Sequence, residues 1–220
     1  MQYAKYRKTS SELIPVYVSL GDMETPVWMQ QLWEEGEYAL YVRKNGCGHC
    51  CAAMALMMHG VDMDPHREYA LCRELWGAPR DEGERRQGNF QSIAGISKIL
   101  GRYGVPTRVY GVSDREVAIA NILSALEDGK QVIFESHPRP DFPENPFSPG
   151  EHWVMAIGFV EDGRILVANS SLRATAEGYQ LVDAATIRDA LYLGAAPEDD
   201  LTWGEWSNEH ITGVGYIIVG

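Results

Sequence analysis

The feature that most constrains this chain is the segment CGHCCAAMALMMHG at residues 47–60, which is apolar on nearly every side if it forms a helix. A surface helix has one apolar face, whereas a helix that is apolar all round is buried. Asn45 and Gly46 break the chain directly before this segment, and Gly60 ends it. The sequence therefore predicts a central helix that begins at or beside Cys47 and is surrounded by the rest of the chain.

Size and charge limit the classes of protein that the chain can be. Its 220 residues, 45% of them hydrophobic, fit one domain with a single core. The net charge of −12 argues against nucleic acid, because neutralising phosphates requires clusters of Lys and Arg. No stretch has the length of a membrane span, and the first twenty residues lack the features of a signal peptide. The four cysteines are too few and too clustered for a disulfide framework, so we expect free thiols in the cytoplasm.

The periodic patterns place most helices in the first half of the chain and most strands in the second. We predict one α+β domain over residues 1–220, with a helical half at about 1–105 packed on an antiparallel sheet half at about 106–220. Helices are expected at residues 26–36, 47–60, 64–76, 92–103, 114–126 and 184–193. Strands are expected at residues 13–20, 38–42, 107–112, 130–136, 152–160, 164–170 and 213–220. Five prolines make residues 137–150 an irregular loop.

The first interpretation of the cysteine cluster is a redox pair, since Cys47 and Cys50 form a Cys-x-x-Cys motif at a helix N-terminus. Thioredoxin-like proteins have a tryptophan before the first cysteine and a proline loop that faces the dithiol. Here Gly46 stands in the tryptophan position, and the candidate proline, Pro106, follows two predicted helices and a long polar loop. A dithiol oxidoreductase therefore stays a less favoured alternative.

The second interpretation is a metal site built from Cys47, His49, Cys50 and Cys51. Zinc sites require a second ligand pair at matching spacing, and the sequence offers no second Cys-x-x-Cys or His-x-x-x-His motif. Cys72 stands alone on a helical pattern. We therefore expect no metal and no other cofactor.

The third interpretation is a nucleophilic thiol, which needs a helix N-terminus to favour the thiolate, a histidine base and a group that orients this base. Cys47 stands where the central helix begins, and His152 opens a predicted strand after the proline-rich loop. Asn169 ends the next strand, and its side-chain carbonyl can accept the Nδ1–H of His152. Cys50 and Cys51 are expected to fill the core. Either His49 or His137 could bind substrate, but the default expectation for both is the solvated surface.

These residues bring out a family resemblance over roughly residues 14–170. The chain is similar to the papain-like cysteine peptidases of the bacteriocin-processing, or double-glycine leader, branch and their stand-alone relatives. The similarity rests on Gly46-Cys47-Gly48, Ala53-Met54, SALEDGKQVIF, His152-Trp153-Val154, Gly158 and DGRILVAN. The resemblance implies a papain-like fold with its site between a helical half and an antiparallel sheet. It also implies that Cys47 is the nucleophile, His152 the base and Asn169 the orienting group.

One position departs from the family pattern. A glutamine upstream of the cysteine commonly completes the oxyanion hole there, in contexts such as PYxSQ, but PVYVSL ends in Leu20 here. Gln30 and Gln31 are the candidates to replace it. Loss of one oxyanion donor lowers the rate by about a hundredfold to a thousandfold, so the resemblance predicts a slow enzyme if neither glutamine substitutes.

The leading hypothesis is therefore a cysteine peptidase that acts on a peptide or protein through an acyl-enzyme. The alternative is a catalytically weak or inactive papain-like domain that binds a peptide or protein partner in the same cleft. Amidase and transferase reactions use the same three residue types, so the sequence leaves the reaction and the substrate open. It also leaves the oligomeric state open.

Overall fold

The structure is a computed structural model that describes residues 15–29, 39–76, 93–194 and 215–220. A hairpin of two strands opens it, and six further strands form the main sheet. The strands are β1 (Val16–Leu20), β2 (Met23–Val27), β3 (Thr107–Gly111), β4 (Gln131–Ser136), β5 (His152–Phe159), β6 (Ile165–Ala168), β7 (Tyr179–Val182) and β8 (Gly215–Val219). The helices are α1 (Ala39–Asn45), α2 (Cys47–Met58), α3 (Pro65–Trp76), α4 (Ile93–Arg102), α5 (Arg115–Glu127) and α6 (Ala184–Ala190).

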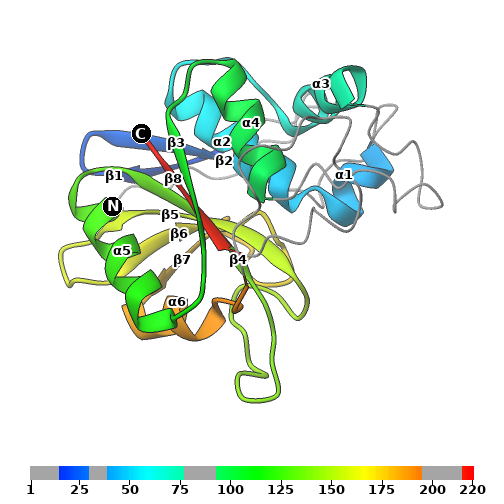
Figure 1. Ribbon diagram of the computed structural model, residues 1–220. Coiled ribbons are helices and arrows are strands. Elements are labelled where there is room, and N and C mark those ends of the chain that lie inside the picture. The colour runs from blue at the N-terminus through cyan, green and yellow to red at the C-terminus, as the bar shows by residue number, and fades with distance from the viewer. Residues whose placement is uncertain (1–14, 30–38, 77–92, 195–214) are drawn as a thin grey trace.

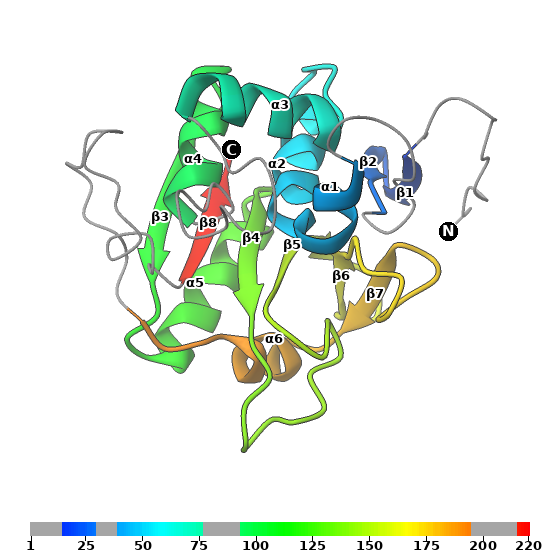
Figure 2. The same cartoon turned by 90° about the vertical axis from the view of Figure 1, so that its right-hand side faces the viewer.

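The main sheet has the strand order β3-β8-β4-β5-β6-β7, and every neighbouring pair in it is antiparallel. Helices α2 and α4 pack on one face, with α1 and α3 against α2, while α5 and α6 cover the other face (Figures 1 and 2). The α+β prediction, with helices of the first half packed on an antiparallel sheet, is thus confirmed. No helix in the described ranges is both long and apolar enough to cross a membrane.

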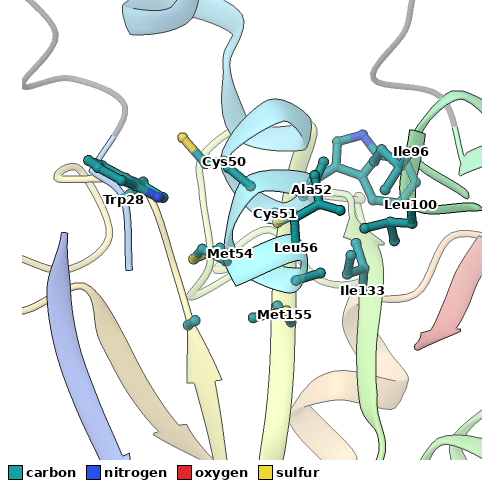
Figure 3. Packing of buried hydrophobic residues seen from close by; sticks show 14 of the residues in the cluster. Trp28, Cys50, Cys51, Ala52, Met54, Leu56, Ile96, Leu100, Ile133 and Met155 are labelled. Carbon is teal, nitrogen blue, oxygen red and sulfur yellow. The ribbon is translucent and has the colours of Figure 1, made fainter. Parts of the chain in front are cut away.

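Helix α2 lies at the centre of the helical layer, as its all-round apolar sequence predicts. It contacts β5 below, β2 on one side, and α3 and α4 on the others. Figure 3 shows its side chains reaching out in several directions, with Trp28 on one side, Ile96 and Leu100 on another, and Met155 of β5 beneath. Because apolar partners surround the helix, the position of its N-terminus, and so of Cys47, is set by packing rather than by a loop.

Strands β4 and β5 divide the interior into two cores, because successive side chains of a strand point to opposite faces of the sheet. Ile133 and Met155 join the core under α2. Phe134 and Val154 join the second core, under α5 and α6. The sheet is therefore buried on both faces in this region, and the strand ends are left to carry polar side chains.

The helix starts and ends follow the local signals in the sequence. Asp64 accepts a hydrogen bond from the Arg67 amide at the start of α3, and Asp114 accepts one from the Glu116 amide at the start of α5. Gly60 and Gly104 follow α2 and α4 with φ of +80° and +76°. These left-handed conformations suit glycine and explain why both helices end where the sequence predicts.

Two predicted elements are wrong, and the sequence predicts neither β2 nor β7. Residues 38–42 were predicted as a strand from their aromatic and β-branched content, but residues 39–42 belong to α1, which packs on α2 and α3. The helix predicted at 26–36 is wrong at its start, because Pro26 and Val27 belong to β2. In each case tertiary contacts outweigh short local preferences.

Gly46 joins α1 to α2 where the two helices approach closely. A Cβ atom at this position would lie 2.3 Å from the Val42 carbonyl oxygen and 2.8 Å from Val42 Cγ1. The Gly46 amide donates to the same oxygen at 2.8 Å, so the backbone cannot move away without breaking this bond. We expect Gly46→Ala to lower the free energy of unfolding by about 1–3 kcal/mol, measured by urea denaturation.

The matched control is Gly101→Ala. Gly101 lies near the end of α4, and a Cβ atom there would meet nothing within 4 Å. Because alanine favours the helix over glycine by roughly 0.5–1 kcal/mol, this variant should be neutral or more stable. Equal effects of the two substitutions would contradict the close approach at Gly46.

Candidate active site

Cys47 is the first residue of α2, directly after the N-cap residue Gly46. It keeps partial exposure, whereas Cys50, Cys51 and Cys72 are 0–1% exposed. The backbone N–H groups of Trp153 and Gly48 lie near its sulfur and act to lower its pKa. The helix N-terminus and these donors favour a negative charge at this position.

Burial nevertheless dominates the acidity of this thiol. The pKa of Cys47 is raised to about 11, because burial, with a smaller contribution from the nearby Glu135 carboxylate, outweighs the lowering effect of the Trp153 amide. The sulfur is therefore a neutral thiol at neutral pH in the unliganded protein. A thiolate requires a base or a change in the surroundings.

His152 opens β5, and Asn169 follows the last residue of the neighbouring strand β6. The antiparallel pairing of these strands brings the two side chains together, with His152 Nε2 2.8 Å from Asn169 Oδ1. The predicted pairing of the two residues is thus present. The ring nitrogen differs, because the sequence predicted Nδ1 and the structure uses Nε2.

The orientation of the Asn169 amide follows from its other contacts. Its Nδ2 donates to the Phe147 carbonyl oxygen at 3.0 Å and to Gln180 Oε1 at 2.7 Å. Its Oδ1 accepts from the Ser171 amide at 2.9 Å. Since Oδ1 can only accept, His152 Nε2 must carry the proton in this contact. The neutral ring therefore keeps its basic lone pair on Nδ1.

Gln180 is a residue of this site that sequence reasoning missed. It lies on β7, where it accepts from Asn169 and its Nε2 donates to the Pro146 carbonyl oxygen at 2.8 Å. Gln180 thus connects the orienting amide to the loop before β5. Gln180 could not be identified from the sequence, because it lies on the unpredicted strand β7 and no short-range pattern marks it.

Burial also controls the acidity of His152, which is 3% exposed. It lowers the pKa of His152 to about 4, and the hydrogen bond to Asn169 offsets part of this shift. The imidazole is therefore neutral at neutral pH. It can accept a proton at Nδ1 but does not hold one in the unliganded protein.

Cys47 and His152 line the same cavity, which has a volume of about 600 Å³. The end of α1, Glu135 of β4, residues 148–151 of the proline-rich loop, Trp153 and the segment after β6 complete its wall. The cavity thus lies between the helical layer and one end of the sheet. Asn169 is fully buried behind the cavity wall, where it contacts the lining residues His152 and Ser171.

Two groups of described side chains bring donor atoms close enough to hold a metal ion. The first is His49, Glu68 and Cys72, all 1% exposed, between α2 and α3. Its members also bond to one another, because His49 Nδ1 contacts Glu68 Oε2 and Cys72 Sγ lies 3.2 Å from Glu68 Oε1. This polar cluster joins the first turn of α2 to α3. The prediction that His49 is a surface residue is wrong.

The second group is Glu135, His137 and Glu151, at the rim of the cavity. His137 Nε2 lies 3.3 Å from Glu135 Oε1, and His137 Nδ1 lies 3.9 Å from Glu151 Oε1. Burial lowers the pKa of His137, but the two carboxylates outweigh this effect and raise it overall. His137 is 14% exposed, so it is partly buried at this rim and keeps some contact with solvent.

Leu20, which stands where the family pattern has the oxyanion glutamine, lies away from this cavity. Its Cδ2 is 2.7 Å from the position of a Cβ atom on Gly158. Gly158 is six residues along β5 from His152, which corresponds to about 20 Å of strand. By contrast, Val27 and Met29 lie against Gly178, which is close to the site. The carbonyl oxygen of Gly178 accepts a hydrogen bond from the backbone N–H of Asn169 at 2.9 Å. Gln30 and Gln31, the predicted oxyanion donors, lie outside the described residues.

Comparisons with known proteins identify the family and the fold of this chain. The model of the Peptidase_C39 like family matches residues 25–195, so the chain belongs to this family of cysteine peptidase-like proteins. A putative C39-like peptidase from Bacillus anthracis has a similar structure, with a TM-score of 0.52, 14% identity, and coverage of 93% of this chain and 97% of that one. This likeness identifies the fold as the papain-like fold that the sequence predicts.

A second solved structure is a double glycine motif protease from an AMS/PCAT transporter in complex with the leader peptide. It matches with a TM-score of 0.43 and 15% identity, over 92% of this chain and 94% of that one. No curated protein matches the sequence.

The raised pKa of Cys47 predicts how the rate of alkylation of this thiol depends on pH. Because burial raises this pKa to about 11, the fraction of thiolate should increase with pH throughout the range from 6 to 10. We expect the rate of Cys47 alkylation by iodoacetamide to increase about tenfold per pH unit over this range. Mass spectrometry of the labelled peptide measures the rate, and Cys47→Ser identifies the background from other thiols. A rate that levels off below pH 7 would instead indicate a preformed thiolate–imidazolium pair.

Proposed function

We propose that this protein is a cysteine peptidase in which Cys47 is the nucleophile, His152 the general base and Asn169 the group that orients the base. One observation carries the proposal. The Nε2 of His152 is hydrogen-bonded to the buried Asn169 side chain, so the basic nitrogen of the ring is Nδ1. The same ring lines one cavity together with the Cys47 thiol. Membership of the Peptidase_C39 like family supports the same chemistry.

The reaction begins when His152 Nδ1 takes the proton from Cys47 Sγ and the sulfur attacks the carbonyl carbon of a peptide bond. The oxyanion of the tetrahedral intermediate lies near the N-terminus of α2, whose backbone N–H groups favour negative charge. His152 then returns the proton to the leaving amine, and an acyl-enzyme remains. Water, deprotonated by His152, hydrolyses this thioester and restores the thiol.

The pKa values of the two groups favour a proton transfer that occurs late. The pKa of Cys47 is raised to about 11 and that of His152 is lowered to about 4, both chiefly by burial, so the resting pair is neutral. Proton transfer therefore accompanies attack on the substrate rather than preceding it. In this respect the proposed enzyme differs from one that rests as a thiolate–imidazolium pair.

The same pKa values favour a second candidate, a domain of the same fold that binds a peptide without hydrolysing it. A buried neutral thiol beside a carboxylate is a weak nucleophile, because attack requires the charge to form in a site that opposes it. In this case the cavity of about 600 Å³ would hold the peptide and Cys47 would take no part. Substituting the three proposed residues separates the two candidates.

The test of the proposed function is hydrolysis of a fluorogenic peptide library by the purified protein and its variants. We expect Cys47→Ala and His152→Ala each to lower kcat/KM by at least about a thousandfold. Asn169→Ala should lower it by about 10- to 100-fold, because the base survives but its tautomer is no longer fixed. His59→Ala serves as the control, since His59 is an exposed histidine at the far end of α2.

Unchanged hydrolysis in Cys47→Ala would exclude the thiol mechanism. Absence of hydrolysis from every library member, together with peptide binding that survives in Cys47→Ala, would instead establish the binding domain. Urea denaturation of each variant distinguishes a lost reaction from a lost fold.

We also propose that Gln30 or Gln31 supplies the side-chain donor of the oxyanion hole. The proposal is supported by the course of the chain, because Met29 lies beside Gly178 and so near the Asn169 backbone, whereas Leu20 lies at the opposite end of β5. We expect one of the two variants, Gln30→Ala or Gln31→Ala, to lower kcat by about 100- to 1000-fold with little change in KM. The other variant should behave as the wild type. Near-wild-type kcat in both would exclude these residues.

A further inference from the structure

The carboxylate of Glu135 lies in the candidate active-site cavity, where the proposed mechanism has no use for it. Glu135 is on β4 opposite Trp153 of β5, and it shares the sheet face of Ile133, which packs under α2. Its side chain is 15% exposed and lines the cavity together with Cys47 and His152. The strand register thus places a largely buried carboxylate beside the nucleophile.

This arrangement opposes the proposed chemistry in the free protein. A negative charge next to a thiol disfavours the thiolate, and the field of Glu135 acts on Cys47 in this direction. Three basic residues, Arg43, Lys44 and Arg173, also line the cavity. Among the described residues, however, no Lys or Arg side chain lies within 4 Å of the Glu135 carboxylate. Its nearest basic group in the described part of the chain is therefore the imidazole of His137, and no described Lys or Arg neutralises this carboxylate.

The neighbour of this carboxylate is His137, whose Nε2 lies 3.3 Å from Glu135 Oε1. This contact uses one oxygen of a group that can accept several hydrogen bonds. The ring of His137 is held on its other side by Tyr192, at a distance of 4.7 Å between ring centroids. Glu135 thus keeps acceptor capacity for a group that enters the cavity.

We propose that Glu135 is a specificity-determining residue, which selects peptides that carry a lysine or arginine side chain beside the scissile bond. This inference rests on the proposed function and names the substrate class of the same site. A cation placed against Glu135 neutralises the charge that opposes the thiolate, so the preferred substrate also promotes its own attack. An apolar side chain leaves the partly desolvated carboxylate with His137 as its partner, and an acidic side chain is repelled by it.

The charge selectivity can be measured on the thiol itself, without any peptide hydrolysis. Methanethiosulfonate reagents react when the thiolate attacks the sulfenyl sulfur, which forms a mixed disulfide and releases methanesulfinate. We compare a trimethylammonium-ethyl reagent with a sulfonatoethyl reagent of similar size. Both react with the same thiolate, so the ratio of their rate constants reports the local electric field and not the thiol pKa. Labelling is assigned to Cys47 by mass spectrometry and by its absence in Cys47→Ser.

The measured quantity is the rate constant for the cationic reagent divided by that for the anionic reagent. We expect this ratio to be at least about tenfold higher for the wild-type protein than for free cysteine. Glu135→Gln should remove most of this preference. Glu151→Gln should have a smaller effect, because Glu151 is 75% exposed at the rim. Glu127→Gln, an exposed residue of α5 on the opposite face of the sheet, should have none.

A wild-type ratio equal to that of free cysteine would overturn the proposal. It would equally be overturned by a ratio that Glu135→Gln leaves unchanged, or by a larger effect of Glu151→Gln. The second arm compares peptides with lysine, norleucine or glutamate next to the scissile bond. We expect kcat/KM to favour lysine over norleucine by at least about tenfold, and Glu135→Gln to abolish this preference.

The two arms separate this inference from the proposed function. A charge-selective thiol in a protein that cleaves no peptide would overturn the peptidase while supporting the role of Glu135 in binding a cation. Cleavage without preference for a cationic side chain would support the peptidase and overturn the role of Glu135.

Discussion

The structure depends on the burial of α2, because this helix has no polar face that could be exposed to water. Its residues from Gly48 to Leu56 are buried, and apolar side chains of β2, α3, α4 and β5 surround them. Such burial is the dominant favourable contribution to folding, and it is available only if sheet and helices close around this one segment. The close approach at Gly46 and the polar cluster of His49, Glu68 and Cys72 then fix the first turn. The nucleophile candidate thus stands at the start of a helix whose position is fixed by packing on all sides.

Much of this architecture could be predicted from the sequence, because the relevant signals are local. Asp64 and Asp114 mark helix starts, Gly60 and Gly104 mark helix ends, and the Asp162-Gly163 turn marks the hairpin of β5 and β6. The same hairpin explains why His152 and Asn169 could be paired from the sequence alone. Two residues on adjacent antiparallel strands, near the same ends, must come close once the register is known.

Other features could not be predicted, because they arise from contacts between distant segments. Residues 39–42 have strand-like side chains, yet they form a helix that packs on α2 and α3. In the sequence His49 resembles a surface residue, but in the fold Glu68 of α3 contacts it and the side chain is buried. The choice of Nε2 over Nδ1 depends on the Asn169 amide, which is oriented by Phe147, Ser171 and Gln180 from three separate parts of the chain. No spacing within the sequence encodes such a network.

The cavity takes its walls from both layers of the fold, with α1 and Cys47 on one side and β4 and β5 on the other. A molecule seated there joins the layers as a non-covalent cross-link. Since it binds the folded chain and not the unfolded one, its affinity adds to the stability of the whole protein. The melting temperature is thereby a direct reporter of occupancy, even for a compound that is never converted. Ligands of this cavity can consequently be discovered by thermal shift before any substrate is known.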